Sequence, residues 1–368
     1  MDVWDAIVVG AGPGGCAAAY DLAVAGQSVL LLDKSDFPRP KACAGGLTIK
    51  AVKTLRYSIE PVVRTVVRRV QLEGEGLSTW LRSREPICVM TVRGEFDEYC
   101  LGKTIGVGAD FRKISAVREI TRSESGVQLT TADAAYRARF LIGADGASGQ
   151  VRRLCGKGSW FSPGFALEVQ TSMPKGEVDL TFDFGSVPQG YAWVFPKGDH
   201  LNVGIYSQSC SAGLTRSGLL RYVKQRLGVD AYHVTGQYLG MGAEASGVDY
   251  VRADLQGRVL LVGDAGGFVD PLTGEGIYGA LLSGQAAAAA VLAESRRDGA
   301  AAEVFAANVR GYLQTLRFSA RAAGAFYRNP ERGFRAMRLP LVRRTMVKTY
   351  THGLNVNSLA MRVALSRC

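Results

Sequence analysis

The chain has 368 residues, of which 47% are hydrophobic and 21% charged, and its formal net charge is +11 at pH 7. This length and composition describe a globular protein with one large core or two moderate ones. The cysteines and three histidines form neither a C-x-x-C pair nor a cluster at metal-ligand spacing, so we expect a cytoplasmic protein without a metal site. The cysteines are Cys16, Cys43, Cys88, Cys100, Cys155, Cys210 and Cys368.

The chain opens with a strand, a glycine-rich turn and a helix. The apolar run from Ala6 to Val9 predicts a buried parallel strand, and we expect no signal peptide before it. The turn reads Gly10-Ala11-Gly12-Pro13-Gly14-Gly15, a helix is predicted over 16–25, and a second buried strand over 28–32 leads to Asp33. This is the G-x-G-x-x-G fingerprint of a dinucleotide site in its full context.

Each part of this fingerprint has a physical role in holding a nucleotide. Gly10 permits the tight turn, Gly12 lets the backbone approach a pyrophosphate, and Gly15 lets helix and strand pack closely. The helix N-terminus offers free N–H groups and the positive end of its dipole to the phosphates. Asp33 suits a ribose with a free 2′-hydroxyl. The predicted contacts here also include Pro13, Gly14 and Lys34. The fingerprint alone leaves open whether the nucleotide is NAD(P) or FAD.

The middle of the chain alternates between short helices and strands. After a proline- and glycine-containing loop over 34–47, we predict helices over 48–57 and 93–101, a strand pair within 66–92, and short strands over 111–120, 127–131, 136–139 and 140–143. From 165 to 206 the apolar residues recur with period two, which predicts an antiparallel sheet with strands near 178–184, 191–195 and 201–206.

The last third of the chain is mainly helical. We predict a helix over 216–227, a buried strand over 258–264, and basic helices over 300–350. The apolar run over 276–293 is rich in Gly and Ala, so we expect it to pack inside the protein and not to span a membrane.

The predicted fold class is α/β, with a Rossmann-like nucleotide-binding domain interleaved with an antiparallel-sheet substrate domain and followed by a helical tail. The nucleotide-binding domain is assigned to 1–65, 93–155 and 250–298. The substrate domain is assigned to 66–92 and 156–249, and the tail to 299–368.

The positive charge is concentrated in the tail. Residues 312–368 contain eleven of the 44 Lys and Arg side chains and one of the 33 acidic side chains, Glu331, so the remaining chain is nearly neutral. Two interpretations stay open: a solvated helical face, and a peripheral attachment to an anionic membrane surface. We predict no nucleic-acid partner, because the sequence contains no recognised nucleic-acid module.

Two later segments add to the opening fingerprint. They are Ala144-Asp145-Gly146 with Ser148 and Arg152, and Gly263-Asp264-Ala265 followed by Pro271, Gly274, Gly276 and Ile277. In this order and at these separations the three segments resemble the FAD-binding pattern of the p-hydroxybenzoate-hydroxylase-like flavoproteins. The resemblance implies that Asp145 and Gly146 lie near the pyrophosphate and that Asp264, after Gly263, binds the ribityl chain. It places Gly276 and Ile277 beside the isoalloxazine, brings Arg93 to the cofactor and brings the backbone of Val117 to the adenine.

A narrower resemblance rests on three other segments. They are Pro40-Lys41-Ala42-Cys43-Ala44-Gly45-Gly46-Leu47, Arg93-x-x-Phe96-Asp97 and Tyr191-Ala192-Trp193-Val194-Phe195-Pro196. Together they are similar to the geranylgeranyl reductase family over most of 3–300. The last segment is the most specific, because it separates the family from its hydroxylase relatives. The resemblance implies an FAD-dependent enzyme that saturates carbon–carbon double bonds of a polyprenyl chain, and it adds Lys41, Cys43, Ala44 and Gly274 to the predicted cofactor contacts.

The substrate contacts follow from the chemistry. An isolated alkene must be held against the reduced flavin in a dry slot. Tyr191, Trp193 and Phe195 share one strand face and could form its apolar wall, with Pro271 beside it, although the same pattern is also typical of sheet core. Cys43 is a candidate proton donor or gate, or a small buried side chain, and Tyr191 is a second candidate acid. His200 is expected on a solvated turn.

The electron donor stays open between a transiently bound NADPH and ferredoxin or another redox protein, because the chain has no second glycine fingerprint. The activity also has two alternatives. One is an FAD-dependent aromatic monooxygenase or halogenase on the same fold, against which the early Trp-x-Trp-x-Ile-Pro segment of halogenases is absent. The other is a flavin-carrying, membrane-associated protein without turnover.

Overall fold

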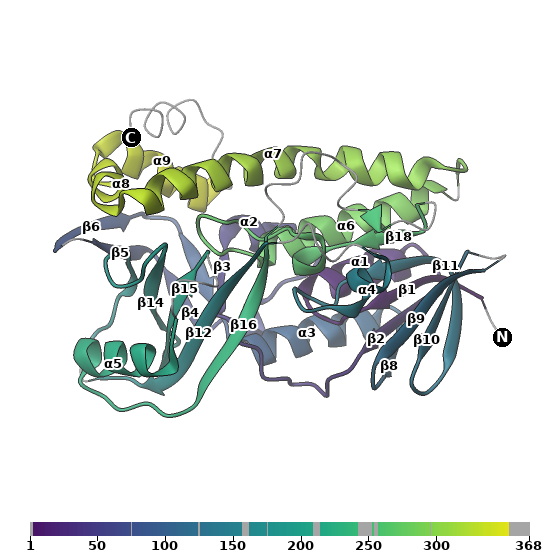
Figure 1. Cartoon of the computed structure of the whole chain (residues 1–368), viewed down its shortest axis with the longest axis horizontal. Coiled ribbons are helices and arrows are strands. Elements are labelled where there is room, and N and C mark those ends of the chain that lie inside the picture. The colour runs from purple at the N-terminus through teal and green to yellow at the C-terminus, as the bar shows by residue number, and fades with distance from the viewer. Residues whose placement is uncertain are drawn as a thin grey trace.

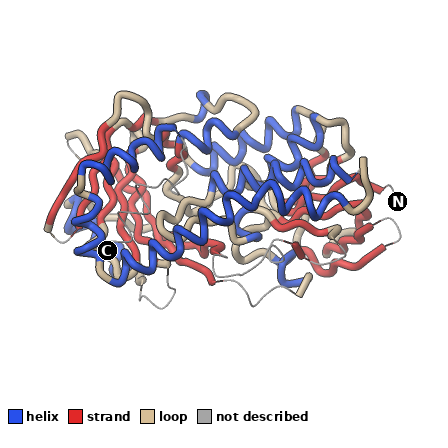
Figure 2. Tube along the Cα trace, turned by 90° about the horizontal axis from the view of Figure 1, so that it is seen from above, coloured by secondary structure: helices blue, strands red, loops and turns tan. Residues whose placement is uncertain are grey.

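The computed structural model describes residues 3–74, 76–123, 126–156, 162–174, 176–208, 214–241, 252–253, 257–294 and 296–352. Two large sheets lie at opposite ends of the long axis of the molecule, and the long helix α7 (Ala300–Arg328) runs across both (Figure 1). Seen from above, helices lie over the strands along the whole length (Figure 2). Cys210, Cys368 and the part of the predicted tail after residue 352 lie outside the described residues.

The eight-stranded sheet contains the fingerprint. Its strand order is β17-β18-β11-β1-β2-β8, and β10 and β9 extend it in antiparallel fashion from β11. The strands are β1 (Val3–Val9), β2 (Val29–Asp33), β8 (Asp110–Lys113), β9 (Val117–Ser123), β10 (Gly126–Thr131), β11 (Ala135–Gly143), β17 (Arg252–Ala253) and β18 (Val259–Leu261). The neighbours from β18 to β8 are parallel. Of these, β2 and β18 are fully buried, in agreement with their continuous apolar sequences, whereas β8 at the edge is charged and partly exposed.

Two strand predictions in this region are wrong. The predicted strand over 111–120 is two strands, because the carboxylate of Asp133 accepts the backbone N–H of Ser115 at 3.0 Å and holds a turn between β8 and β9. The predicted strands over 136–139 and 140–143 are the single strand β11. One edge of β11 pairs with β1, and the other pairs first with β10 and then with β18, so the change of partner produces no break in the chain.

The seven-stranded sheet lies at the other end of the molecule, in the order β16-β12-β15-β14-β13-β5-β6 (Figure 1). The pairing of β13 with β5 is parallel, so the sheet is mixed and not purely antiparallel as predicted. The strands are β5 (Arg69–Gly74), β6 (Leu77–Arg82), β12 (Ser162–Ser172), β13 (Leu180–Asp183), β14 (Gly190–Pro196), β15 (His200–Ser207) and β16 (Val234–Met241).

A small third sheet joins the two large ones. It consists of β3 (Gly46–Thr48), β7 (Cys88–Met90) and β4 (Thr65–Val67), all antiparallel. The segment predicted as a strand pair within 66–92 therefore contains strands of two different sheets. Since β3 follows the cysteine-containing loop directly, this small sheet fixes where that loop enters the space between the two large sheets.

Helices complete both halves of the molecule. They are α1 (Pro13–Val24), α2 (Ile49–Thr54), α3 (Arg93–Gly106), α4 (Gln150–Leu154), α5 (Arg216–Leu227), α6 (Ile277–Glu294), α7, α8 (Pro330–Met337) and α9 (Pro340–His352), with the 3₁₀ turns η1 (Glu60–Val62) and η3 (Gly263–Gly266). The first helix begins at Pro13 and not at Cys16, since proline suits the first helical position. Of the described helices, α6 alone is long and apolar enough to cross a membrane, and 67% of it is buried.

Glycines let α6 pack tightly on the fingerprint helix. A Cβ on Gly284 of α6 would lie 2.2 Å from the carbonyl O of Gly14, and a Cβ on Gly14 would lie 3.1 Å from the carbonyl O of Ala280. The α6 backbone therefore lies directly against the start of α1. The N-terminus of α6 is brought to the same region of the molecule as the glycine-rich turn.

Candidate active site

The glycines of the fingerprint permit two close backbone approaches. A Cβ on Gly15 would lie 1.8 Å from the carbonyl O of Gly10, and a Cβ on Gly10, where φ is +107°, would lie 2.3 Å from the carbonyl O of Ala144. Only glycine fits at such distances. Gly12 instead faces the guanidinium of Arg39, whose Nη2 would lie 3.1 Å from a Cβ there. The start of α1 thus offers free N–H groups beside a cation, which fits the pyrophosphate of FAD.

Asp33 lies at the end of β2, as predicted, and its carboxylate also braces the glycine-rich turn. Its Oδ2 accepts the N–H of Ala11 at 2.7 Å and its Oδ1 accepts the N–H of Ser35 at 2.9 Å. The side chain is 5% exposed. Lys34, the next predicted contact, lies exposed on the surface.

The three segments of the predicted FAD pattern meet in space. The carbonyl of Ala144 packs on Gly10, and Arg152 donates from Nη2 to the carbonyl O of Ala147 at 2.7 Å and from Nη1 to that of Ala265 at 3.1 Å. Arg152 therefore ties the second segment to the third. Within the third segment, a Cβ on Gly276 would lie 3.3 Å from Oδ1 of Asp264, so this carboxylate faces the residue that precedes α6.

A buried ion cluster links the fingerprint to the cysteine loop. Asp97 is fully buried and accepts from Nε of Arg93 at 3.0 Å and from Nη2 of Arg39 at 3.0 Å. Arg39 also reaches Oδ2 of Asp33 at 3.7 Å. The arrangement brings the predicted Arg93 to the site. Arg39 and Asp97 were not among the predicted site residues. Asp97 stands inside a segment that carried the family resemblance, and Arg39 directly precedes another.

Lys41 and Asp264 form a second charged pair at this site. Burial lowers the pKa of Lys41 and raises that of Asp264, and the charge of each opposes the shift of the other. The N–H of Gly240 also donates to Oδ2 of Asp264 at 3.4 Å. A carboxylate held in this way is available to accept hydroxyl groups of a ribityl chain.

Several predicted residues make protein contacts that the sequence did not indicate. Asp145 caps α4, since its Oδ2 accepts the N–H groups of Gln150 at 2.5 Å and Val151 at 2.9 Å. Gly146 follows it with φ of +82°. The N–H of Val117 donates to Oε1 of Gln150 at 3.1 Å. In the third segment, the N–H of Gly263 donates to Oγ of Ser283 at 2.9 Å.

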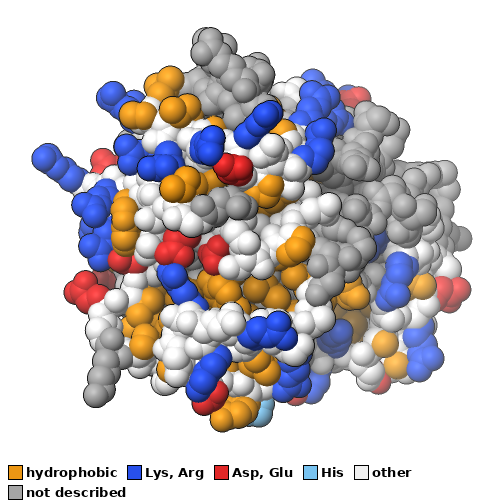
Figure 3. All heavy atoms as spheres, turned by 60° about the vertical axis from the view of Figure 1, so that its left-hand side comes forward, with side chains coloured by type: hydrophobic (Ala, Val, Ile, Leu, Met, Phe, Trp, Pro, Cys, Tyr) orange, Lys and Arg blue, Asp and Glu red, His pale blue; other side chains and the backbone are white. Residues whose placement is uncertain are grey.

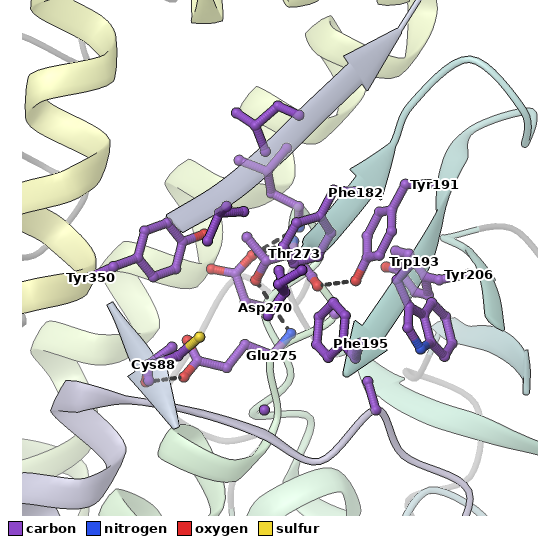
Figure 4. Close-up of a pocket in the computed structure, with 18 of the residues that line it drawn as sticks. Cys88, Phe182, Tyr191, Trp193, Phe195, Tyr206, Asp270, Thr273, Glu275 and Tyr350 are labelled. Carbon is purple, nitrogen blue, oxygen red and sulfur yellow. Dashed lines mark hydrogen bonds between the residues drawn. The ribbon is translucent and has the colours of Figure 1, made fainter. Parts of the chain in front are cut away.

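An apolar cavity of about 260 Å³ lies between the seven-stranded sheet and the helices (Figure 4). Its wall is an aromatic cluster in which Tyr191, Trp193 and Phe195 of β14 are joined by Phe182 of β13 and Tyr206 of β15. The ring centroids of Phe182 lie 5.3 Å from Tyr191 and 5.2 Å from Phe195, both edge to face. The period-two pattern on β14 therefore lines a cavity and does not merely fill a core.

The floor of the cavity is the loop between η3 and α6. Asp270, Thr273, Gly274 and Glu275 line it, and the hydroxyl of Tyr191 donates to the carbonyl O of Thr273 (Figure 4). Gly276 and Ile277 line the cavity as well, so the N-terminus of α6 opens onto it. Their neighbour Pro271 differs from its prediction: it is not among the lining residues, and its carbonyl accepts the hydroxyl of Tyr206 at 3.0 Å.

The roof of the cavity comes from the basic tail. Met337 of α8 and Met346 and Tyr350 of α9 line it, and Tyr350 faces the aromatic wall from the opposite side (Figure 4). Phe334 of α8 is fully buried against Gly74 of β5. These helices are therefore not solvated on all sides. Most of their arginines are exposed, Arg343 is half-buried and donates to Oγ1 of Thr79 at 3.3 Å, and the apolar faces of the two helices close the cavity.

The cysteine loop separates this cavity from a smaller, polar one of about 120 Å³. Cys43 lines both cavities, Ala44 lines the apolar one and Lys41 the polar one. Arg93 lines the polar cavity together with Cys43. His200 lines the polar cavity at the start of β15, which differs from the solvated turn expected for it.

Comparisons with known proteins agree with this geometry. A family model described as NAD(P)-binding Rossmann-like domain matches residues 8–41. The chain is 30% identical over 317 residues to digeranylgeranylglycerophospholipid reductase 2 of Methanosphaera stadtmanae, which covers 80% of this chain and 79% of that protein. It is 33% identical over 319 residues to menaquinone reductase of Mycobacterium tuberculosis, which covers 78% and 76% of the two chains.

The chain belongs to the geranylgeranyl reductase family. Its fold matches that of a geranylgeranyl bacteriochlorophyll reductase-like protein of Thermoplasma acidophilum, with a TM-score of 0.75 and 21% identity over 100% of this chain and 96% of that one. A flavin-dependent brominase shares the fold to the same degree, with a TM-score of 0.75 and 17% identity over 99% of both chains. The predicted fold class is confirmed, and the protein is an FAD-dependent oxidoreductase.

Two further residues of this geranylgeranyl reductase family member line the cavities but were not among the predicted site residues. Glu168 of β12 and Lys197, which follows β14, are 6% and 3% exposed and line the polar cavity. Glu168 also lines the apolar one. The alternation along 165–169 placed Glu168 opposite the apolar face of its own strand, and Lys197 directly follows Tyr-x-Trp-x-Phe-Pro. These are the only signals of either residue in the sequence.

Proposed function

We propose that this protein saturates carbon–carbon double bonds of a polyprenyl chain by hydride transfer from reduced FAD. The observation that carries the proposal is an apolar, aromatic-walled cavity onto which the N-terminus of α6 and the cysteine loop both open. An unpolarised alkene has no group to hydrogen-bond, so it must be held by shape and by exclusion of water. The names of the relatives, which include a digeranylgeranylglycerophospholipid reductase, support a prenyl lipid.

The residues that would hold FAD come from all three segments. We assign the pyrophosphate to the turn at Gly12 beside Arg39, the adenosine ribose to Asp33, and the ribityl chain to Asp264. The isoalloxazine is assigned to the space between Cys43 and the start of α6. When bound in its reduced form, FAD supplies the hydride, and the dipole of α6 favours the anionic reduced ring.

The aromatic side chains would hold the prenyl chain. Tyr191, Trp193 and Phe195 present one apolar surface, and Tyr350 faces it from the opposite side (Figure 4). Met346 also lines the cavity. Because the Tyr191 hydroxyl already donates to Thr273, we assign this residue to the wall of the slot and not to proton transfer. Cys43 stays in the active site as a residue on the boundary between the two cavities.

The turn between α8 and α9 supports attachment to a membrane. Leu339 and Leu341 are 53% and 62% exposed, and the neighbouring Arg338 and Arg344 are exposed as well. Figure 3 shows Lys and Arg side chains with hydrophobic side chains between them on this end of the molecule. Since the same two helices roof the cavity, we propose that this turn rests on an anionic bilayer and that the lipid substrate enters there.

Mass spectrometry tests the activity. The enzyme, loaded with FAD and reduced by dithionite, is incubated with geranylgeranyl diphosphate in the absence of oxygen. We expect products heavier by two hydrogen atoms for each bond reduced. Products that gain one oxygen atom, and only when oxygen is supplied, would instead identify a monooxygenase. Comparing NADPH with reduced ferredoxin in place of dithionite then identifies the donor.

A separate assay tests the membrane surface. The wild type is expected to sediment with phosphatidylglycerol vesicles and to stay in solution with phosphatidylcholine vesicles. The double variant Arg338→Glu and Arg344→Glu should lose this binding and still reduce a prenyl diphosphate supplied in detergent. Equal sedimentation of both proteins would overturn the membrane assignment and leave the reductase assignment standing.

A further inference from the structure

Glu168 lies on the wall between the apolar and the polar cavity. It lines both, as Cys43 does, whereas the polar cavity is otherwise lined by charged and polar groups such as Arg39, Lys197 and His200. A cavity lined by charged and polar groups is accessible to water, whereas placing an apolar prenyl chain there would leave those groups without hydrogen-bond partners. Glu168 is thus a carboxyl group with one side toward the alkene slot and the other toward a source of protons.

The strand register places Glu168 beside the aromatic wall. Glu168 pairs with Gly204 of β15, and Gly204 pairs with Trp193 of β14. Residues opposite one another on paired strands share a face. A Cβ on Gly204 would lie 2.1 Å from the Trp193 ring, so glycine leaves the space that the indole occupies. The carboxyl group and the indole consequently belong to one row across the sheet.

The contacts of Glu168 hold its carboxyl group in place. The backbone of Cys43 and the side chain of Asn202 lie next to it, and both lower the pKa of the carboxyl group. Asn202 in turn accepts from Nε1 of Trp193 at 2.7 Å. The acid therefore lies between the cysteine loop and the side chain that holds the indole of the aromatic wall.

Charged neighbours set the protonation of Glu168. Burial raises its pKa, and the bonds from Asn202 and Cys43 together with the charges of Lys197 and Arg93 offset part of that rise. Lys197 donates from Nζ to the carbonyl oxygens of Ala44 and Thr91, the latter at 2.9 Å, and burial lowers its pKa to about 8. The other ionisable groups around the polar cavity are Arg39, Lys41, Cys43 and His200.

Most of the other acidic groups that line the apolar cavity are engaged in hydrogen bonds or ion pairs. Tyr350 and Cys88 line it as well, and burial raises the pKa of both, which makes them weaker acids than a glutamic acid. Tyr191 and Tyr206 donate their hydroxyl protons to backbone carbonyls. Glu275 accepts from Thr48 at 2.6 Å and from Lys50 at 2.7 Å, and Asp270 accepts from Ser319 at 2.8 Å and from backbone N–H groups, so both side chains are already engaged in protein contacts.

We propose that Glu168 is the general acid of the reduction and that Cys43 and Lys197 position it. This inference rests on the proposed function. The O–H bond of Glu168 breaks as a C–H bond forms at one alkene carbon, and the other carbon receives the hydride that reduced FAD supplies to the reaction. The Glu168 carboxylate that remains is stabilised by its neighbours Asn202 and Cys43 and by the charge of Lys197, and it regains a proton from water in the polar cavity. A carboxylic acid is also a stronger acid than a thiol, which favours Glu168 over Cys43 for an unpolarised alkene.

Anaerobic stopped-flow kinetics test the proposal. Dithionite-reduced wild type, Glu168→Gln and Cys43→Ala are mixed with geranylgeranyl diphosphate, and flavin reoxidation is followed between pH 6 and 9. We expect Glu168→Gln to be slower by about 10²-fold or more and to lose its pH dependence. Cys43→Ala should lose less, about tenfold at most, and keep its pH dependence, because the backbone N–H that holds Glu168 remains. Glu177→Gln, a change at a side chain 95% exposed, is the matched control.

The outcomes separate this inference from the proposed function. Reoxidation of Glu168→Gln at the wild-type rate, or loss confined to Cys43→Ala, overturns the role of Glu168 and leaves the reductase standing. If no variant is reoxidised, the reductase fails, and an infrared titration still decides about Glu168. The wild type should show a carboxylic acid band at neutral pH that is absent in Glu168→Gln. A band lost near the ordinary glutamate pKa of about 4.3 would overturn the inference.

The role of Lys197 has its own readout. Because its charge lowers the pKa of Glu168, Lys197→Met should raise that pKa. The activity falls as Glu168 loses its proton, so the alkaline limit of reoxidation should move to higher pH in this variant. A structural role alone would lower the rate at every pH and leave the limit where it is in the wild type.

Discussion

The nucleotide cradle and the apolar cavity lie next to each other but are built on different principles. The cradle consists of backbone approaches such as Gly15 to Gly10 and of one buried ion cluster around Asp97. The cavity consists of large side chains from distant strands and helices, with Trp193 and Tyr350 on opposite sides. In the cradle, one added methyl group or one removed charge is therefore expected to disturb the backbone or the ion cluster. In the cavity, a changed side chain is expected to alter the shape of the space and leave the fold intact. We expect changes in the cradle to remove the cofactor and changes in the cavity to alter the substrate.

The largest effect is expected in the cradle, for Asp97→Asn. This substitution leaves the guanidinium groups of Arg93 and Arg39 without their shared counter-charge in a buried site. The free energy of unfolding should fall by about 3–5 kcal/mol in urea denaturation, and the purified protein should lose FAD. Asp36→Asn is the control, since Asp36 is 82% exposed, and it should change stability by less than about 0.5 kcal/mol. Equal stability of the two variants would contradict the importance of the cluster.

The boundary between the two regions is tested by Lys197→Met. The folded pKa of Lys197 is about 8 against an ordinary 10.5, so the unfolded chain binds more protons between these values. The stability of the wild type relative to Lys197→Met should consequently rise with pH from about 8 to about 10.5, by up to about 3 kcal/mol. Denaturation series at several pH values measure this difference. A difference that stays constant with pH would show that the Lys197 ammonium is not disfavoured by folding.

Gly15→Ala tests how closely the cradle is packed. The new Cβ would meet the carbonyl O of Gly10, which is backbone and cannot move aside. We expect a loss of about 1–3 kcal/mol and a protein with little bound FAD. Gly102→Ala in α3, where a Cβ meets nothing within 4 Å, should instead be neutral or stabilising by up to about 1 kcal/mol. A Gly15→Ala protein that is as yellow and as stable as the wild type would contradict the assignment of the cradle.

The smallest effect is expected in the cavity, for Tyr191→Phe. The ring stays in the wall, and only the hydrogen bond to the Thr273 carbonyl is lost. Thermal unfolding should show a loss of about 0.5–1.5 kcal/mol, and steady-state kinetics should show reduction within about tenfold of the wild type. Complete loss of activity with unchanged stability would make Tyr191 an acid and would contradict its role as wall.

The cradle could be predicted from the sequence because its determinants are local. The apolar run at Ala6–Val9, the spaced glycines and Asp33 all lie within one strand–helix–strand unit, and each has a direct physical role there. The family resemblance then added the two distant segments. Asp97 was present in a matched motif and Arg39 directly precedes another, but only the three-dimensional structure shows that they share one ion cluster.

The cavity could be predicted only in part, because its walls come from segments far apart in the chain. The alternation on β14 indicated the aromatic wall, but the parallel pairing of β13 with β5 joins residues more than 100 positions apart and left no local signal. The many arginines of α8 and α9 indicated a solvated or membrane-facing surface. The apolar residues between them gave no local signal of the cavity that they line. In the sequence Glu168 is one polar residue of an alternating strand. Its place between two cavities is evident only in the three-dimensional structure.

An anaerobic spectral titration tests the central claim most directly. Reduced, FAD-loaded protein is mixed with a geranylgeranyl lipid, and in parallel with the same lipid whose prenyl chain is fully saturated. We predict that the unsaturated lipid restores the spectrum of oxidised flavin in proportion to the double bonds consumed, and that the saturated lipid leaves the flavin reduced. Flavin that stays reduced with every prenyl chain, but is reoxidised by oxygen together with an aromatic substrate, would contradict the claim.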